Sequence, residues 1–168
     1  MLCATDANRK HDNRHNLMRL SKFRQFSINK RITIIVFLCL LTLSLFFTAF
    51  TIEESNNSGL REITSIEALL SGWLGALTLD FASFSWFANP LIVLAIIFFD
   101  EQPRMALLLS IIAVFTALSF LLANEIVANE GGGTRTILTV DTGYYLWLSS
   151  LITTSAISLY TTFTRQKR

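Results

Sequence analysis

The apolar positions of this chain gather into long uninterrupted stretches rather than alternating with polar ones. Three stretches contain no charged side chain, at residues 32–52, 105–123 and 143–163. A helix of about twenty apolar residues is long enough to cross the roughly 30 Å hydrocarbon core of a bilayer. The pattern therefore predicts three transmembrane helices over these ranges.

A fourth apolar stretch, residues 81–99, is interrupted by Asn89 and Pro90. The part after the interruption, residues 91–99, would reach only about 14 Å as a helix, because a helix rises 1.5 Å per residue. The full stretch would reach about 28 Å and cross. Either one helix with a proline kink covers 81–99, or two shorter pieces meet near Asn89. We expect the first, a fourth transmembrane helix over 81–99 with a proline kink inside it.

The proline removes one backbone donor from that helix. Pro90 has no N–H and crowds the carbonyl four residues earlier, which is that of Trp86. In an apolar environment this carbonyl needs another partner. A neighbouring helix is one candidate, and the nearby polar side chains are the others: Ser83, Ser85 and Asn89.

Between the first two predicted spans, the pattern changes to that of a short amphipathic helix. Thr64 and Glu67 match a capping box, which marks a helix N-terminus. Apolar residues then recur with helical spacing as far as Leu77. We expect an interfacial helix over about 65–77, with Trp73 at headgroup depth.

Charge is distributed unevenly over the predicted segments. Twelve of the 14 Lys and Arg residues fall in the N-terminal arm 1–31, in the link 100–104 or at the C-terminus, and only Arg61 and Arg135 fall outside them. Basic residues beside a span resist translocation. The expected topology has both termini in the cytoplasm, a basic arm at 1–31, a single four-helix domain at 32–168 and an outer loop at 124–142.

Composition agrees with this pattern, since 52% of the residues are hydrophobic, 15% are charged and the mean hydropathy is +0.50. These values are typical of membrane proteins rather than of ordinary soluble domains. The sequence thus predicts an all-α, multi-pass membrane protein built as a four-helix bundle, and a bacterial inner membrane is the expected location.

The helix break is the first candidate functional site. Asp80, at the outer edge of the span, joins Asn89 and Pro90 in it. One interpretation is a structural kink. The other is a broken helix whose free backbone ends bind a substrate or an ion, as in transporters.

Two further sets of residues have a predicted role in packing or anchoring. A small-residue stripe in the last span lets another helix approach closely, either within the bundle or from a partner chain: Ser150, Thr154, Ser158 and Thr162. Aromatic residues near span ends are expected to anchor the protein at the membrane interface: Trp73, Trp86, Tyr144, Tyr145 and Trp147.

The remaining polar features indicate no site. Residues 131–133 are three glycines without the Lys-Ser/Thr of a phosphate-binding loop, so they predict a hinge, followed by an extended piece at 135–140. The outer acids have no metal-ligand spacing and predict a solvated rim: Glu125, Glu130 and Asp141. His11 and His15 lack a third ligand, and Cys39 is interpreted as a packing residue.

No catalytic constellation, metal site or cofactor motif is present in the sequence, so we expect no enzyme activity and no cofactor. The overall plan resembles the four-span immunity proteins that protect bacteria from pore-forming bacteriocins, although no motif assigns functional residues through this resemblance. We expect an immunity-type or accessory protein that acts by helix–helix contact with another membrane protein or a peptide. The alternative is an oligomeric subunit of a small transporter or channel that uses the break at Asn89–Pro90.

Expected partners follow from the same features. The basic N-terminal arm precedes an apolar stretch directly, which favours anionic lipid headgroups over nucleic acid. The apolar helices are expected to contact the bilayer and a membrane-protein partner or a second copy of the chain.

Overall fold

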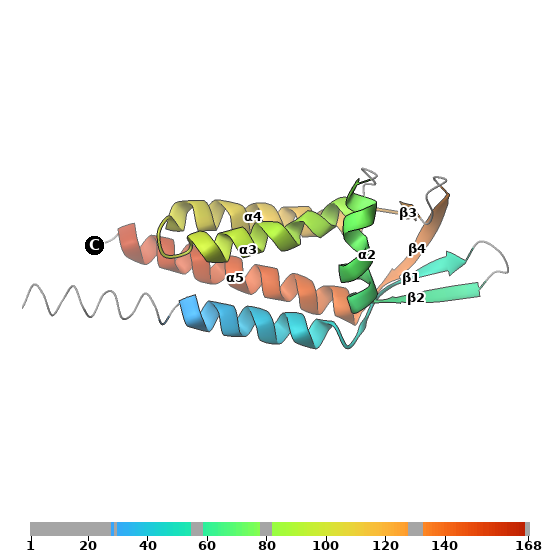
Figure 1. Cartoon of the computed structure of the whole chain (residues 1–168), viewed down its shortest axis with the longest axis horizontal. Coiled ribbons are helices and arrows are strands. Elements are labelled where there is room, and N and C mark those ends of the chain that lie inside the picture. Colours follow the sequence, from blue (N-terminus) through green and yellow to red (C-terminus); the bar gives the residue numbers. More distant parts are fainter. Residues whose placement is uncertain (1–27, 29, 55–58, 78–81, 128–132, 167–168) are drawn as a thin grey trace, which may run out of the picture.

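A computed structural model of the chain describes residues 28, 30–54, 59–77, 82–127 and 133–166. Long helices lie side by side lengthwise, an antiparallel sheet extends from one end, and a shorter helix, α2, lies across the bundle near the sheet (Figure 1). The elements in chain order are a helix over residues 30–44, β1 (Thr48–Glu54), β2 (Gly59–Thr64), α2 (Ser65–Leu77), the 3₁₀ helix η1 (Ser83–Phe87), α3 (Ala88–Phe98), α4 (Pro103–Leu118), the 3₁₀ helix η2 (Ser119–Leu122), β3 (Glu125–Val127), β4 (Thr134–Val140) and α5 (Thr142–Gln166).

The prediction of an all-α protein with four transmembrane helices is wrong. The described residues form a mixed helix-and-sheet fold, and they contain one helix that is long and apolar enough to cross a membrane, Pro103–Leu122. The expected multi-pass topology and bacterial inner-membrane location are overturned with it. The cytoplasmic placement of both termini loses its basis too, because a charge bias orients spans only where spans exist.

The first predicted span fails because the helix stops at residue 44 and the last residues of the span, from Thr48 on, belong to a strand. The helix ends at residue 44, where the Ser44 hydroxyl donates to the carbonyl of Leu41 at 2.7 Å, and β1 begins at Thr48. Thr48, Thr51 and Ile52 are β-branched, which favours a strand over a helix. Hydropathy alone does not separate a buried strand from a helix, and this is why 32–52 was predicted as one element.

The sheet has the strand order β2-β1-β4-β3, and every neighbouring pair is antiparallel. β1 therefore pairs with β2 beside it in the chain and with β4 far along it, where Phe50 lies opposite Val140. Phe50 and Ile52 of β1 are buried. The predicted outer loop 124–142 is in fact the hairpin of β3 and β4, and its extended piece is β4.

The last predicted span is a helix, α5, but it is not apolar enough to count as a candidate span. It contains ten Ser and Thr residues among its 25. These hydroxyl side chains lower its hydropathy, although no charged residue precedes Arg165 in it.

The stretch 81–99 folds as two joined pieces. Residues 83–87 form η1, and α3 continues from Ala88 with no break in direction, because Ala88 itself has helical backbone angles (φ −57°, ψ −31°). Because η1 continues directly into α3, Pro90 lies within one helical stretch, and its missing N–H withholds a helix hydrogen bond from the carbonyl of Trp86. The expected kink is thus a change from 3₁₀ to α-helix just before Asn89.

The inner side of α4 is formed by small side chains. α4 packs against α3 and α5 through residues that are completely buried: Ala106, Ser110, Ala113 and Ala117. Small residues at such positions allow helix backbones to approach closely. Larger buried side chains come from α3, its C-terminal end and α5, namely Ile92, Phe99 and Leu151, and others lie near the sheet, where Phe50, Phe120 and Tyr144 meet.

Candidate functional site

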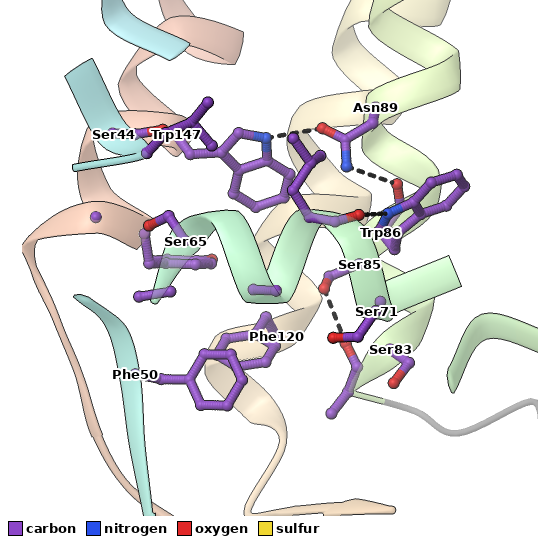
Figure 2. A pocket seen from close by; sticks show the side chains of 18 of the residues that line it. Ser44, Phe50, Ser65, Ser71, Ser83, Ser85, Trp86, Asn89, Phe120 and Trp147 are labelled. Carbon is purple, nitrogen blue, oxygen red and sulfur yellow. Dashed lines mark hydrogen bonds between the residues drawn. The ribbon is translucent and has the colours of Figure 1, made fainter. Parts of the chain in front are cut away.

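At the helix break, the amide side chain of Asn89 makes two hydrogen bonds. Asn89 donates through Nδ2 to the carbonyl of Trp86 at 3.1 Å, and its Oδ1 accepts from the indole N–H of Trp147 at 2.9 Å. Trp86 in turn donates its indole N–H to the carbonyl of Leu69 in α2 at 3.0 Å (Figure 2). One chain of hydrogen bonds thus connects α5, α3, η1 and α2.

Of the partners that the sequence suggested for the carbonyl of Trp86, the structure uses Asn89. Ser85 donates instead to the carbonyl of Ala82 at 2.8 Å. Trp147, predicted as an interface anchor, is half-buried and holds the other end of Asn89. The sequence contains no local signal for this bond, because the two residues are 58 positions apart.

Below α2 lies a cavity of about 110 Å³. Its walls come from the N-terminal helix, the start of β1, α2, η1, α5 and the 3₁₀ helix η2, so it lies where the bundle meets the sheet (Figure 2). Most lining side chains are apolar or aromatic. Among the described residues, two buried serine hydroxyls have no hydrogen-bond partner, those of Ser65 and Ser158, and only Ser65 lines this cavity.

Four aromatic rings line one side of the cavity as a continuous series. The ring centroids of Phe50 and Phe120 lie 5.1 Å apart, those of Phe120 and Tyr144 5.3 Å, and those of Tyr144 and Trp147 5.7 Å. All three pairs are tilted, as is usual for aromatic contacts at these distances. We call these four residues the aromatic wall.

Tyr144 fixes the wall to the bundle. Its hydroxyl donates to the carbonyl of Ala117 in α4 at 2.8 Å, and its side chain is buried. Burial, and to a smaller extent the neighbouring Tyr145, raises the pKa of Tyr144 above its ordinary value, so the hydroxyl remains a donor across the working pH range.

Replacing Tyr144 with Phe is expected to lower the free energy of unfolding by about 1 kcal/mol, the usual net value of one buried hydrogen bond. Chemical denaturation followed by circular dichroism measures this change. Tyr145→Phe is the matched control, because Tyr145 is exposed and should change stability by less than about 0.5 kcal/mol. Equal effects of the two changes would contradict the role of the Tyr144 bond.

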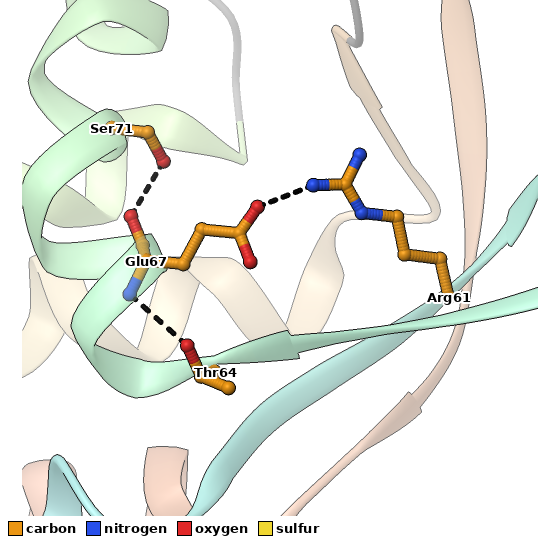
Figure 3. Close-up of polar contacts among 4 residues, drawn as sticks. All are labelled: Arg61, Thr64, Glu67 and Ser71. Atoms are coloured by element: carbon orange, nitrogen blue, oxygen red, sulfur yellow. Dashed lines mark hydrogen bonds and ion pairs between the residues drawn. The ribbon is translucent and has the colours of Figure 1, made fainter.

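The helix α2 covers one side of the cavity, and we call it the cavity roof. It begins at Ser65, as the sequence predicted. The Thr64 hydroxyl accepts from the backbone N–H of Glu67 at 3.3 Å, as in a capping box. The Glu67 carboxylate does not complete the box, because it pairs with Arg61 of β2 at 2.5 Å (Figure 3). The Ser71 hydroxyl donates to the carbonyl of Glu67 at 2.7 Å. These contacts fix α2 at an angle to the sheet.

Glycines let this roof lie close to its neighbours. A Cβ at Gly72 would come within 2.6 Å of the Trp86 ring, and a Cβ at Gly75 would collide with Ser83. At the other side of the cavity, a Cβ at Gly143 would collide with the Ser65 hydroxyl and lie 2.7 Å from the carbonyl oxygen of Thr48. Each glycine therefore marks a close approach that a side chain would obstruct.

The outer side of α4 is the second notable surface. Its large apolar residues are exposed and recur at intervals of three and four: Met105, Leu108, Ile112 and Phe115. We call these residues the α4 outer face. Because the opposite side of α4 has only small buried residues, this helix has its large apolar side chains outside and its small ones inside.

Comparisons with known proteins were made for the whole chain. No family model, curated protein or solved structure matched it. The resemblance to four-span immunity proteins rested on a topology that the fold contradicts, so it no longer applies.

The small-residue stripe predicted on the last span faces inward. All four of its members are buried: Ser150, Thr154, Ser158 and Thr162. Thr154 donates to the carbonyl of Ser150 at 2.8 Å, and Thr162 contacts the carbonyls of Ser158 and Pro103 at 2.9 and 3.2 Å. Of the two interpretations, packing within the chain fits this placement, and the stripe is not a free docking surface.

The other candidate residues are dispersed. Trp73 and Tyr145 are exposed, Trp86 is half-buried, and Cys39 is exposed rather than packed. Asp80, Glu130, His11, His15 and residues 131–132 lie outside the described residues. In the part of the chain that the structure describes, no group of three potential metal ligands comes together.

The sequence analysis missed the α4 outer face and the Ser65–Gly143 contact. The first had a readable signal, because large and small apolar residues separate onto two sides of residues 103–118 at helical spacing. The second had none, since it depends on a contact between residues 78 positions apart.

Proposed function

We propose that this chain is a non-catalytic binding protein that acts by helix–helix contact with a membrane protein or a membrane-active peptide. The α4 outer face is its docking surface, and an apolar helix is the partner element. The observation that carries this proposal is the arrangement of α4, which exposes Phe115 to 69% while it buries Ala106, Ala113 and Ala117 completely.

Exposure of the α4 outer face to water is energetically unfavourable. Large apolar side chains left in water forgo roughly 1.5–3 kcal/mol each compared with full burial. Met105, Leu108, Ile112 and Phe115 are all more than 40% exposed and lie on one side of a helix. A contiguous apolar surface of this kind marks an interaction site.

The spacing favours a helix as the occupant. Intervals of three, four and three residues place these side chains on one stripe, which is the seam that a second helix packs against. The neighbouring α3 also exposes large apolar side chains: Val93, Leu94 and Ile97. Acyl chains would also cover it, but they have no preference for this periodicity.

The basic arm at residues 1–31 has a separate proposed role. Its charge suits anionic lipid headgroups, which would hold the protein beside a membrane where its partner lies. The transporter alternative receives no support from the helix break, because Asn89 uses its amide group to bond Trp86 and Trp147.

Ile112→Lys is expected to reduce partner capture at least tenfold, since it places a charge at the centre of the proposed seam. The experiment is photocrosslinking in native membranes, with a photoreactive residue at Leu108 of the full-length chain. Crosslinked species are identified by mass spectrometry. Thr136→Lys on β4 is the control, because Thr136 is exposed and belongs to the sheet rather than to α4.

Three outcomes decide the proposal. Capture of one defined membrane protein or peptide that is lost in Ile112→Lys and retained in Thr136→Lys supports it. Crosslinks to lipid alone, or to a second copy alone, overturn it. Capture that is equally strong in both variants also overturns it, because the contact would then not involve the α4 outer face.

A further inference from the structure

One polar group in the cavity below α2 has no hydrogen-bond partner. Ser65 is 7% exposed, and its hydroxyl oxygen is buried without a hydrogen-bond partner. Other serine hydroxyls in the lining are satisfied, for example those of Ser44, Ser71 and Ser85, each of which donates to a backbone carbonyl at 2.7–2.8 Å. An unpaired buried hydroxyl costs free energy that a bound acceptor or donor would recover.

The rest of the lining defines the shape of such a molecule. The aromatic wall offers tilted ring contacts on one side, and Trp86 closes another. Aromatic side chains prefer offset or edge-to-face contact with a further ring. Both indole N–H groups are already bonded within the chain, so they do not compete for the ligand.

Size and access limit the ligand to one ring. An apolar cavity of about 150 Å³ binds benzene, and this cavity measures about 110 Å³. It adjoins a larger cleft of about 360 Å³ beside α2, and the two share lining residues, among them Phe50, Gly72 and Ile126. A substituent on a ring held in the cavity would thus point toward this cleft.

We propose that the cavity is a binding site for a single-ring aromatic compound that carries a hydroxyl or carbonyl oxygen. The ring packs against the aromatic wall, and the oxygen bonds the Ser65 hydroxyl. Gly143 makes room at this point, because a side chain there would occupy the position of that hydroxyl. The site lies apart from the α4 outer face, and it is independent of the docking role proposed for that surface.

Phenol and toluene provide the test, since they share one shape and differ by a hydroxyl in place of a methyl group. Their dissociation constants for the purified full-length chain are measured by ligand-observed NMR. Ser65→Ala is expected to weaken phenol binding by about five- to tenfold, the effect of one hydrogen bond. Toluene binding should change by less than about twofold.

Two further variants separate the cavity from other surfaces. Ala68→Leu adds bulk to the cavity roof and should weaken both compounds, while circular dichroism confirms that the variant remains folded. Ser149→Ala removes an exposed hydroxyl on α5, outside the cavity, and should change neither affinity. The proposal is overturned if neither compound binds the natural chain, if Ser65→Ala leaves the phenol-to-toluene ratio unchanged, or if Ala68→Leu binds phenol normally.

Discussion

Gly143→Ala is expected to destabilise the protein by about 3 kcal/mol or more, the upper part of the range for forced overpacking. The added methyl group would collide with the Ser65 hydroxyl and lie 2.7 and 2.8 Å from the carbonyl oxygens of Thr48 and Phe47. Two of these three obstacles are backbone atoms, which cannot rotate away. Chemical denaturation of the purified chain measures the change.

A second glycine gives the matched comparison. Among the described residues, a Cβ at Gly75 meets only the side chain of Ser83. Combining Gly75→Ala with Ser83→Gly should therefore recover much of the stability lost by the first change alone. Combining Gly143→Ala with Ser65→Gly should recover little, because the two carbonyls remain in place. Full recovery in the second pair would show that the backbone at 47–48 yields, and that this contact does not fix α5 against β1.

Asn89→Leu is expected to lower the free energy of unfolding by about 2–3 kcal/mol. Leucine keeps the approximate size of the side chain but leaves the indole N–H of Trp147 without its partner, and it removes one of the donors to the carbonyl of Trp86, which also accepts from the N–H of Ala88. A part-buried group that loses its hydrogen bond costs about 1–3 kcal/mol. Denaturation followed by far-ultraviolet circular dichroism avoids the change in tryptophan fluorescence that the substitution itself causes.

Two variants at the same place act as controls. Pro90→Ala should change stability by less than about 1 kcal/mol, since Pro90 is exposed and the carbonyl of Trp86 already accepts from Asn89. Trp147→Phe removes one of the two bonds, so its effect with Asn89→Leu should be less than additive. A larger loss of stability for Pro90→Ala than for Asn89→Leu would mean that the proline, and not the amide group of Asn89, stabilises the junction between η1 and α3.

The local parts of this fold were readable from the sequence. The capping pair Thr64 and Glu67 correctly marked the start of α2, because capping depends on residues three positions apart. The need of the Trp86 carbonyl for a partner followed from Pro90 in the same way, and Asn89 supplies it. Both inferences used spacing within one helical turn.

The sheet was not readable, because its pairing is long-range. β1 was counted as the end of an apolar span, and its second partner, β4, lies about ninety residues further along the chain, where Thr51 and Thr139 pair. The bulged register between Thr51 and Ile52 weakens the simple alternation that marks a strand. The summed hydropathy of such a segment indicates that it is buried. It does not show whether the segment is a strand or a helix.

The candidate site likewise had one part that local spacing predicted and one part that depends on long-range contacts. The stripe from Ser150 to Thr162 was recognised as a packing face, and its spacing left open whether the neighbour was this chain or another. Burial against α4 assigns it to this chain. The cavity, in contrast, is lined by segments spread between residues 41 and 147, so no local sequence pattern predicts it.

The hydroxyl groups of α5 have a consequence for how its contact with α4 is specified. Ser150, Thr154 and Thr161 each donate to a carbonyl of their own helix, three or four residues earlier, at 2.6–2.8 Å. Toward α4 they therefore offer mainly methyl and methylene surface, and the contact between Ser110 and Ser155, at 3.4 Å, is long for a hydroxyl bond. Along the middle of the pair, the match between these two helices is thus set mainly by steric fit, and the hydroxyl bonds between them lie near the ends, from Tyr144 to Ala117 and from Thr162 to Pro103.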